Sequence, residues 1–108
     1  MAQQTTRYSI VIPVLNEAGN IINLYNEIVS VFPSHEPPIE IIFIDDGSTD
    51  GSLEILLSLH KQDQRVKIIQ FRRNFGQTSA FAAGFEFATG EVIITLDADG
   101  QNNPADIP

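Results

Sequence analysis

Short apolar runs alternate with amphipathic segments along most of the chain. Four of these runs are rich in Ile, Val and Phe and have the length of buried β-strands; they lie at residues 8–13, 39–45, 66–71 and 91–97. The segments between them carry apolar residues at helical spacing. The pattern therefore predicts four strands that alternate with three helices.

The first two helices are each predicted from one apolar face and one boundary residue. The first is expected at about residues 18–32, because Pro33 ends it. Its apolar face consists of Ile21, Tyr25, Ile28 and Phe32. Asp50 is a good N-cap for the second helix. The apolar face of that helix is expected to consist of Leu53, Leu56, Leu57 and His60.

The third predicted helix, over residues 77–88, carries Ala and Phe on nearly all sides and almost no charge. A helix that is apolar all round is expected to be buried. Its aromatic residues Phe81, Phe85 and Phe87 are therefore assigned to the core and not to a surface that stacks on a ligand.

Continuous apolar strands that alternate with helices predict an α/β fold, in which a mostly parallel sheet is covered by helices on both faces. In such sheets, ligands bind at the carboxyl ends of the strands. Polar residues follow all four predicted strands at this end, so their loops are expected to form one site. These residues are Asn16 and Glu17, Asp45 and Asp46, Arg72, Arg73 and Asn74, and Asp97 and Asp99.

Length, charge and composition restrict the class of protein. A chain of 108 residues suits one domain. The net charge of −8, with six Lys and Arg residues, excludes nucleic acid as a partner, because phosphate binding there requires a basic face. Without Cys, the chain forms no disulfide. No stretch of residues 1–108 approaches the roughly 20 apolar residues of a membrane helix.

The strand ends lack the glycine-rich phosphate loops of dinucleotide-binding and P-loop proteins, and they offer carboxylates instead. An acidic site binds a diphosphate only when a divalent cation lies between the two. Asp97 and Asp99 supply hard oxygen ligands, and Gln101 adds a neutral oxygen, which suits Mg²⁺ or Mn²⁺. The alternative interpretation of Asp97 and Asp99 is a turn that caps a helix.

The segment from Asp45 to Asp50 also has two interpretations. Gly47 can form a turn and Asp50 can cap a helix, and neither role requires a ligand. The adjacent carboxylates of Asp45 and Asp46 repel each other, however. This repulsion favours a ligand, such as a nucleobase imide or a ribose hydroxyl, that donates hydrogen bonds to them.

Other polar residues have simpler explanations. Glu17 suits the first turn of a helix, where the helix dipole favours an acidic residue. Arg72 and Arg73 are either solvated, or one of them meets a phosphate. His35 and His60 are assigned structural or exposed positions without a functional role.

Four segments together resemble the family 2 glycosyltransferases of the type-A fold, and among these the polyprenyl-phosphate sugar transferases. They occur in the family's order, as Val11–Glu17 (VIPVLNE), Phe43–Asp50 (FIDDGSTD), Arg73–Phe85 and Gly90–Gln101. The resemblance implies that residues 1–108 are the Rossmann-like nucleotide-sugar-binding half of such a domain. The acceptor-binding half, with the catalytic residues, is expected to be missing.

The resemblance also implies roles for individual residues. Asp97 and Asp99, with Gln101, would hold the metal and through it the diphosphate. Gly100 departs from the Leu that is usual in this branch, and it loosens the turn that carries Gln101; Asn103 is a second departure. The implied nucleotide-binding residues are Pro13, Asn16, Glu17, Asp45, Asp46, Gly47, Asn74, Gln77 and Asp97.

The activity implied by the resemblance is a metal-dependent, inverting transfer of a sugar from a UDP- or GDP-sugar. The acceptor would be a polyprenyl phosphate, such as undecaprenyl or dolichyl phosphate, at the cytoplasmic face of a membrane. The 108-residue chain is expected to bind the donor nucleotide at most.

Two other functions match parts of the sequence. The segment Ile94–Gly100 resembles the strand and Asp-x-Asp-Gly motif of haloacid dehalogenase-type phosphohydrolases, although Gln101 stands where Thr or Val is usual. The chain is alternatively a non-catalytic module for nucleotide binding or assembly. Under the family's strand order, the fourth strand would expose an unpaired apolar edge at Val92–Leu96, so a homo-oligomer is expected.

Overall fold

The computed structural model describes residues 6–34 and 36–98 and contains a four-stranded parallel sheet with three helices. In chain order the elements are β1 (Tyr8–Val14), α1 (Ile21–Val31), β2 (Ile39–Asp45), α2 (Ser52–Gln62), β3 (Val66–Gln70), α3 (Gln77–Phe87) and β4 (Val92–Thr95). The strand order is β3-β2-β1-β4. The predicted α/β fold and the parallel sheet are therefore confirmed.

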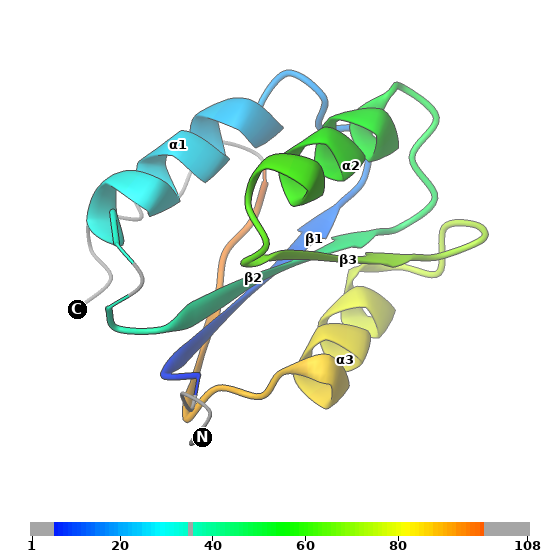
Figure 1. The fold of residues 1–108 in the computed structure, drawn as a ribbon. Helices are drawn as coiled ribbons and strands as arrows, with labels where there is room; N and C mark the ends of the chain where they lie inside the picture. Colours follow the sequence, from blue (N-terminus) through cyan, green and yellow to red (C-terminus); the bar gives the residue numbers. More distant parts are fainter. Residues whose placement is uncertain (1–5, 35, 99–108) are drawn as a thin grey trace.

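Helices cover both faces of the sheet, with α1 and α2 on one face and α3 on the other (Figure 1). Side chains of β1 alternate between these two layers. Ile10 and Ile12 belong to the core beneath α1 and α2, whereas Val11 belongs to the smaller core beneath α3. All seven residues of β2 are buried, as expected for a central strand covered on both faces.

The helix α3 lies close to the sheet because Gly84 has no side chain. A Cβ atom at this position would lie 2.3 Å from Cγ1 of Val11 and 3.0 Å from Cδ1 of Ile44. A larger residue would therefore displace the helix. Gln77, the first residue of α3, lies at the carboxyl ends of the strands because α3 begins soon after the end of β3.

Several boundaries differ from those expected. The helix α1 begins at Ile21 and not at residue 18, because the preceding residues form a turn in which Asn20 N donates to Glu17 O at 2.9 Å. The strand β4 covers the four residues that pair with β1, from Val92 to Thr95, and is shorter than the predicted run at residues 91–97.

The expected N-cap of α2 is wrong by one residue. Gly51 occupies that position with a φ of 93°, and Asp50 precedes it. Asp50 still serves the helix, because its Oδ1 accepts from the backbone N–H of Ser52 at 3.0 Å and from the Ser52 hydroxyl at 2.6 Å. The hydroxyl bond holds the pKa of Asp50 below its ordinary value.

The expected apolar face of α2 is also partly wrong. Leu56 and Leu59 are buried, but Leu57 and His60 are exposed. The face is rotated because Ser52 is buried at the start of the helix, where its hydroxyl has polar partners. Apolar spacing alone does not reveal such a buried polar residue.

The predicted burial of α3 is wrong for most of its surface. Ala80 and Gly84 are its buried residues. Phe85 and Phe87 are 46% and 47% exposed and do not belong to the core. Phe81 is half-buried, and its ring stacks on Phe85 with 6.0 Å between centroids. The sheet covers one side of α3, and no other element of the described residues covers the opposite side.

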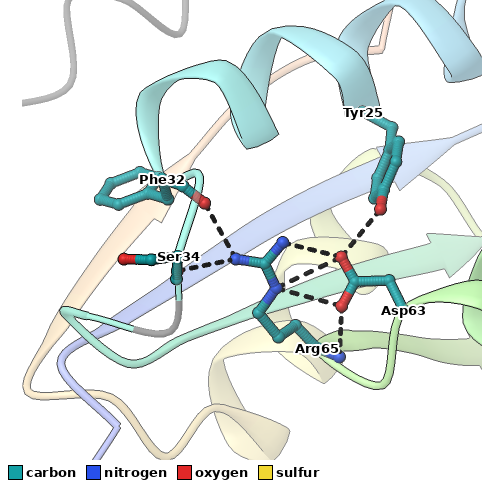
Figure 2. A network of polar contacts seen from close by, with 5 residues as sticks. All are labelled: Tyr25, Phe32, Ser34, Asp63 and Arg65. Carbon is teal, nitrogen blue, oxygen red and sulfur yellow. Dashed lines mark hydrogen bonds and ion pairs between the residues drawn. The ribbon is translucent and has the colours of Figure 1, made fainter.

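A polar network fastens the end of the sheet that lies opposite the carboxyl ends of the strands (Figure 2). Asp63 accepts hydrogen bonds from Arg65 and from the Tyr25 hydroxyl, the latter at 2.8 Å. Arg65 also donates to the carbonyl oxygens of Phe32 at 2.9 Å and Ser34 at 3.2 Å. The Arg65 guanidinium lowers the pKa of Asp63 to about 2. The network joins the end of α1 to the turn before β3.

Candidate functional site

A cleft of about 510 Å³ lies at the carboxyl ends of the strands. Segments that follow all four strands contribute to its walls, so the loops converge as the sequence predicted. Six of the predicted nucleotide-binding residues line the cleft: Pro13, Glu17, Asp46, Asn74, Gln77 and Asp97. The remaining three, Asn16, Asp45 and Gly47, lie behind these walls.

Asn16 joins the loops that follow β1 and β2. It adopts the left-handed conformation, with a φ of 55°. Its Oδ1 accepts from the backbone N–H of Thr49 at 2.8 Å, and its own N–H donates to the hydroxyl of Ser48 at 2.9 Å. Asn tolerates this conformation better than most residues do. Asn16 therefore shapes the cleft through these loops without facing it.

Two further hydrogen bonds join the same loops. The backbone N–H of Glu17 donates to the hydroxyl of Ser52 at 3.1 Å, and that of Ala18 donates to Oδ2 of Asp50 at 3.1 Å. Sequence reasoning missed the structural roles of Ser48, Thr49 and Ser52. The run of hydroxyl residues directly after the two adjacent aspartates was the available signal.

Glu17 lies in the turn before α1 and not in its first helical turn, which corrects the sequence interpretation. Its carboxylate accepts from the side-chain amide of Asn20 at 2.7 Å. This contact holds the Glu17 side chain at the wall of the cleft.

Asp46 is 3% exposed and binds backbone of the loop between β3 and α3. Its two carboxylate oxygens accept from the N–H of Phe75 at 2.7 Å and of Gly76 at 3.0 Å. Asp45 is 2% exposed and accepts from the N–H of Ser48 at 3.3 Å. These backbone donors account for both buried carboxylates without a ligand, so their mutual repulsion is no longer evidence for one. Binding of a ligand by Asp45 or Asp46 stays a prediction.

Gly47 permits the close contact between the β2–α2 loop and the β3–α3 loop. Its φ is 82°, and a Cβ atom there would lie 2.6 Å from both the carbonyl carbon of Arg73 and the nitrogen of Asn74. Both observations favour Gly, because other residues rarely adopt this φ and would collide with the backbone.

Gln77 and Asp97 connect two walls of the cleft. Nε2 of Gln77 donates to Oδ1 of Asp97 at 2.8 Å. The other expected metal ligands, Asp99 and Gln101, lie outside the described residues. Within residues 6–34 and 36–98, no group of three acidic, His or Cys side chains is placed to hold a metal ion. The oxygen donors at Asp97 fit the chemistry of a hard divalent cation.

The basic residues beside the cleft are exposed. Arg72 and Arg73 form no ion pair with the described carboxylates, and the Arg73 guanidinium lies 4.9 Å from the centroid of the Phe75 ring. His60 has the expected structural role, with Nδ1 located 2.6 Å from the carbonyl oxygen of Val66. His35 lies outside the described residues.

The sequence profile of glycosyl transferase family 2 matches residues 9–108, so the chain belongs to this family. The phosphohydrolase interpretation loses its support, because its motif begins at the first strand of its own fold. Here Asp97 follows β4, the last and outermost strand of the described sheet.

Three curated relatives share 37–44% identity with this chain. They are an uncharacterized glycosyltransferase of Bacillus subtilis (44% identical over 91% of this chain), the undecaprenyl-phosphate 4-deoxy-4-formamido-L-arabinose transferase of Edwardsiella ictaluri (43% over 93%) and the dodecaprenyl-phosphate galacturonate synthase of Rhizobium johnstonii (37% over 97%). The chain spans 30–31% of the length of these relatives.

Solved structures show the same fold at lower identity. TarS of S. aureus, residues 1–349 in complex with UDP, has a TM-score of 0.76 and 24% identity, over 87% of this chain and 28% of that one. A mannosyltransferase of Pyrobaculum calidifontis, in complex with GDP-Man and Mn²⁺, has a TM-score of 0.78 and 23% identity, over 86% and 27%. The fold is that of type-A glycosyltransferases.

Proposed function

We propose that residues 1–108 form the nucleotide-sugar-binding part of a glycosyltransferase whose acceptor is a polyprenyl phosphate. The observation that carries the proposal is the convergence of four loops, with acidic and amide side chains, on one cleft in a chain of this family. Relatives named as polyprenyl-phosphate transferases support the acceptor class. The proposal assigns acceptor binding and catalysis to a longer protein of the relatives' length.

The walls of the cleft suit different parts of the donor. Pro13, Glu17 and Asp46 offer an apolar surface and carboxylate oxygens, which suit a base and a ribose. Asn74, in the loop after β3, and Gln77, at the start of α3, also line the cleft and suit the phosphates. Behind the walls, three residues support the loops without facing the ligand; they are Asn16, Asp45 and Gly47.

A divalent cation, Mg²⁺ or Mn²⁺, is part of the proposal, because an acidic cleft and a diphosphate repel each other. Asp97, together with Asp99 and Gln101, would hold it through oxygen atoms. When bound, the cation supplies charge neutralisation for the leaving nucleoside diphosphate. The mannosyltransferase bound to GDP-Man and Mn²⁺ supports this assignment for the type-A fold.

The proposed reaction is one in-line displacement. A phosphate oxygen of the acceptor forms a bond to the anomeric carbon of the sugar, while the bond from that carbon to the nucleoside diphosphate breaks. The configuration at the anomeric carbon is therefore inverted. The acceptor phosphate is already anionic near neutral pH, so the step does not require a strong general base.

The proposed site of action is the cytoplasmic face of a membrane, because the acceptor is a lipid. Among the described residues, no helix has both the length and the apolar character needed to span a bilayer.

Calorimetric titration of the chain with UDP and with GDP, each with and without Mn²⁺, tests the donor site. We expect metal-dependent binding of one of the two nucleotides. Asp97→Asn and Asp99→Ala should each weaken it by about tenfold or more, since about 1.4 kcal/mol corresponds to tenfold. Glu54→Gln is the control, because Glu54 is exposed on α2 and does not line the cleft.

Failure of both nucleotides to bind a chain that circular dichroism shows to be folded would refute the donor site. Equal weakening by Glu54→Gln would show that the effect of the Asp variants is not local. A protein of the relatives' full length can be tested with nucleotide sugar, lipid phosphate and metal. If it binds the nucleotide but transfers no sugar, the result would favour the non-catalytic module.

A further inference from the structure

The basic residues of this acidic chain gather at one edge of the sheet. Five of the six Lys and Arg residues lie between residues 61 and 73, where Asp63 is the single acidic residue. This segment comprises the end of α2, the strand β3 and the start of the next loop. Figure 1 shows β3 along one edge of the sheet, between α2 and α3. We call residues 61–75, together with Leu57 and Phe87, the β3 edge.

Three cations of the β3 edge are available to an external anion. Arg65 is paired with Asp63 at 2.8 Å, and Lys67 with the buried Glu40 at 2.9 Å. The other three basic residues are exposed and form no ion pair with any carboxylate in the described part of the chain; they are Lys61, Arg72 and Arg73.

Large apolar side chains of the β3 edge are also exposed. Leu57 is 50% exposed and Phe87 is 47% exposed, and both line a groove of about 380 Å³ with Lys67, whose Nζ lies 6.0 Å from the Phe87 ring. Phe75 is 51% exposed and stacks with Arg73. Cations interspersed with exposed apolar side chains suit the interface of an anionic bilayer, where rings enter the headgroup region.

The loop at one end of the β3 edge is held next to the cleft. Asp46 binds the backbone N–H groups of Phe75 and Gly76, which fixes the loop. Asn74 and Gly76 line the cleft, whereas Arg73 and Phe75 of the same loop are exposed. A lipid surface that contacts Phe75 would therefore lie beside the opening of the cleft.

We propose that the β3 edge docks on an anionic lipid surface and so orients the cleft toward a lipid-linked acceptor. The second half of this statement rests on the proposed function, whereas docking itself does not require a nucleotide. With a net charge of −8, the chain as a whole is repelled by an anionic surface. The β3 edge, which carries five of the six basic residues, is therefore the part of the chain that such a surface attracts.

Co-sedimentation with lipid vesicles tests the proposal. The chain should bind vesicles of phosphatidylglycerol and phosphatidylcholine, bind pure phosphatidylcholine less, and dissociate as salt increases. The double variant Arg72→Gln/Arg73→Gln should lower the partition coefficient roughly tenfold. Arg7→Gln is the control, because Arg7 is the one basic residue outside the segment and is paired with Glu91.

Equal binding to both kinds of vesicle, or an equal loss with Arg7→Gln, would overturn the proposal. Binding to polyglutamate without binding to vesicles would assign the edge to an acidic protein partner.

Nucleotide titration of the double variant separates the docking proposal from the donor-site proposal. We expect the double variant to keep nucleotide binding and to lose vesicle binding. If the double variant loses both nucleotide binding and vesicle binding, the arginines belong to the donor site and the docking proposal is overturned. If the wild-type chain binds vesicles but no nucleotide, the docking proposal stands and the donor site is refuted.

Discussion

Gly47 shows how much of the cleft depends on one missing side chain. The β2–α2 loop and the β3–α3 loop contact each other at this point, with no room for a Cβ atom. Both loops carry residues of the cleft, namely Asp46 on one and Asn74 on the other. A substitution at Gly47 should therefore alter stability and the shape of the cleft together.

Three glycine variants separate backbone strain from collision. Gly47→Ala should lower the free energy of unfolding by about 2 kcal/mol or more, because the left-handed conformation costs about 1–2 kcal/mol and the Cβ atom also collides with backbone. Gly51 has a φ of 93°, but a Cβ atom there would have no contact closer than 3.9 Å. Gly51→Ala should therefore lower the free energy of unfolding by only about 1 kcal/mol. Gly19→Ala, with nothing within 4 Å, should have almost no effect. Urea unfolding measures all three, and equal effects of Gly47→Ala and Gly51→Ala would exclude the collision.

At this scale, the sequence predicted which residues surround the cleft but not what holds them. The turn at Gly47 and the positions of Glu17 and Asp97 followed from the strand ends. The partners of Asp46 are backbone N–H groups of Phe75 and Gly76, far away in the sequence. Such a pairing depends on how two loops meet, which local patterns do not contain.

At the scale of elements, Glu40 connects both neighbouring strands of β2 to the segment that leads into β4. The carboxylate is 1% exposed and accepts from the Ser9 hydroxyl, from the N–H of Thr89 at 2.6 Å and from Lys67. Burial alone would raise the pKa of Glu40, but these hydrogen bonds outweigh burial and lower it.

Removing this carboxylate should loosen β4. Glu40→Ala leaves the Ser9 hydroxyl and the Thr89 N–H without an acceptor and should lower the free energy of unfolding by about 1–3 kcal/mol. Because Thr89 lies just before β4, amide hydrogen exchange in Val92–Thr95 should accelerate more than in α1. Glu86→Ala, at an exposed position of α3, should change stability by less than about 0.5 kcal/mol. Uniform acceleration of exchange would contradict a local role.

The Asp63 network predicts how stability depends on pH. The pKa of Asp63 is depressed to about 2 in the folded state. Its stabilisation is thus complete above the ordinary value near 4, and it is lost as pH falls through about 2. Since one pKa unit corresponds to about 1.4 kcal/mol, the contribution is about 2 kcal/mol.

Urea unfolding between pH 4 and pH 2 measures this contribution. At pH 4, Asp63→Asn should have a lower free energy of unfolding than the wild type. Between pH 4 and pH 2, the decrease in the free energy of unfolding should be about 2 kcal/mol smaller for the variant than for the wild type. Glu27→Gln, at an exposed position on α1, should keep the wild-type dependence. An unchanged pH dependence in Asp63→Asn would show that the network does not stabilise the fold.

The helices and strands could be predicted where the pattern of apolar residues reflects burial within this chain. The bounds of β2 are those predicted, because every residue of that strand is buried. The apolar surface of α3 correctly indicates a helix but does not specify what covers it. The face of α2 was misplaced because Ser52 is buried through hydrogen bonds, which hydrophobic spacing does not register.

At the scale of the whole molecule, the outer side of β4 predicts self-association. No described segment pairs with that side, and β4 carries no charged residue to oppose pairing with another chain. Light scattering at high concentration should therefore detect dimers or larger species, and Ile93→Lys should shift them toward monomer. Ile22→Lys is a matched control, because Ile22 on α1 and Ile93 are both 43% exposed. A wild-type chain that stays monomeric would contradict this prediction.

The strand order also determines when the sheet can be completed during synthesis. β1 leaves the ribosome first, and β2 can pair with one side of it soon afterwards. The other side waits for β4, whose Val92 pairs with Tyr8, so the central strand is half paired until the last described strand exists. Closing so long a loop is slow compared with forming local structure. A nascent chain without β4 should therefore present the free side of β1 to chaperones.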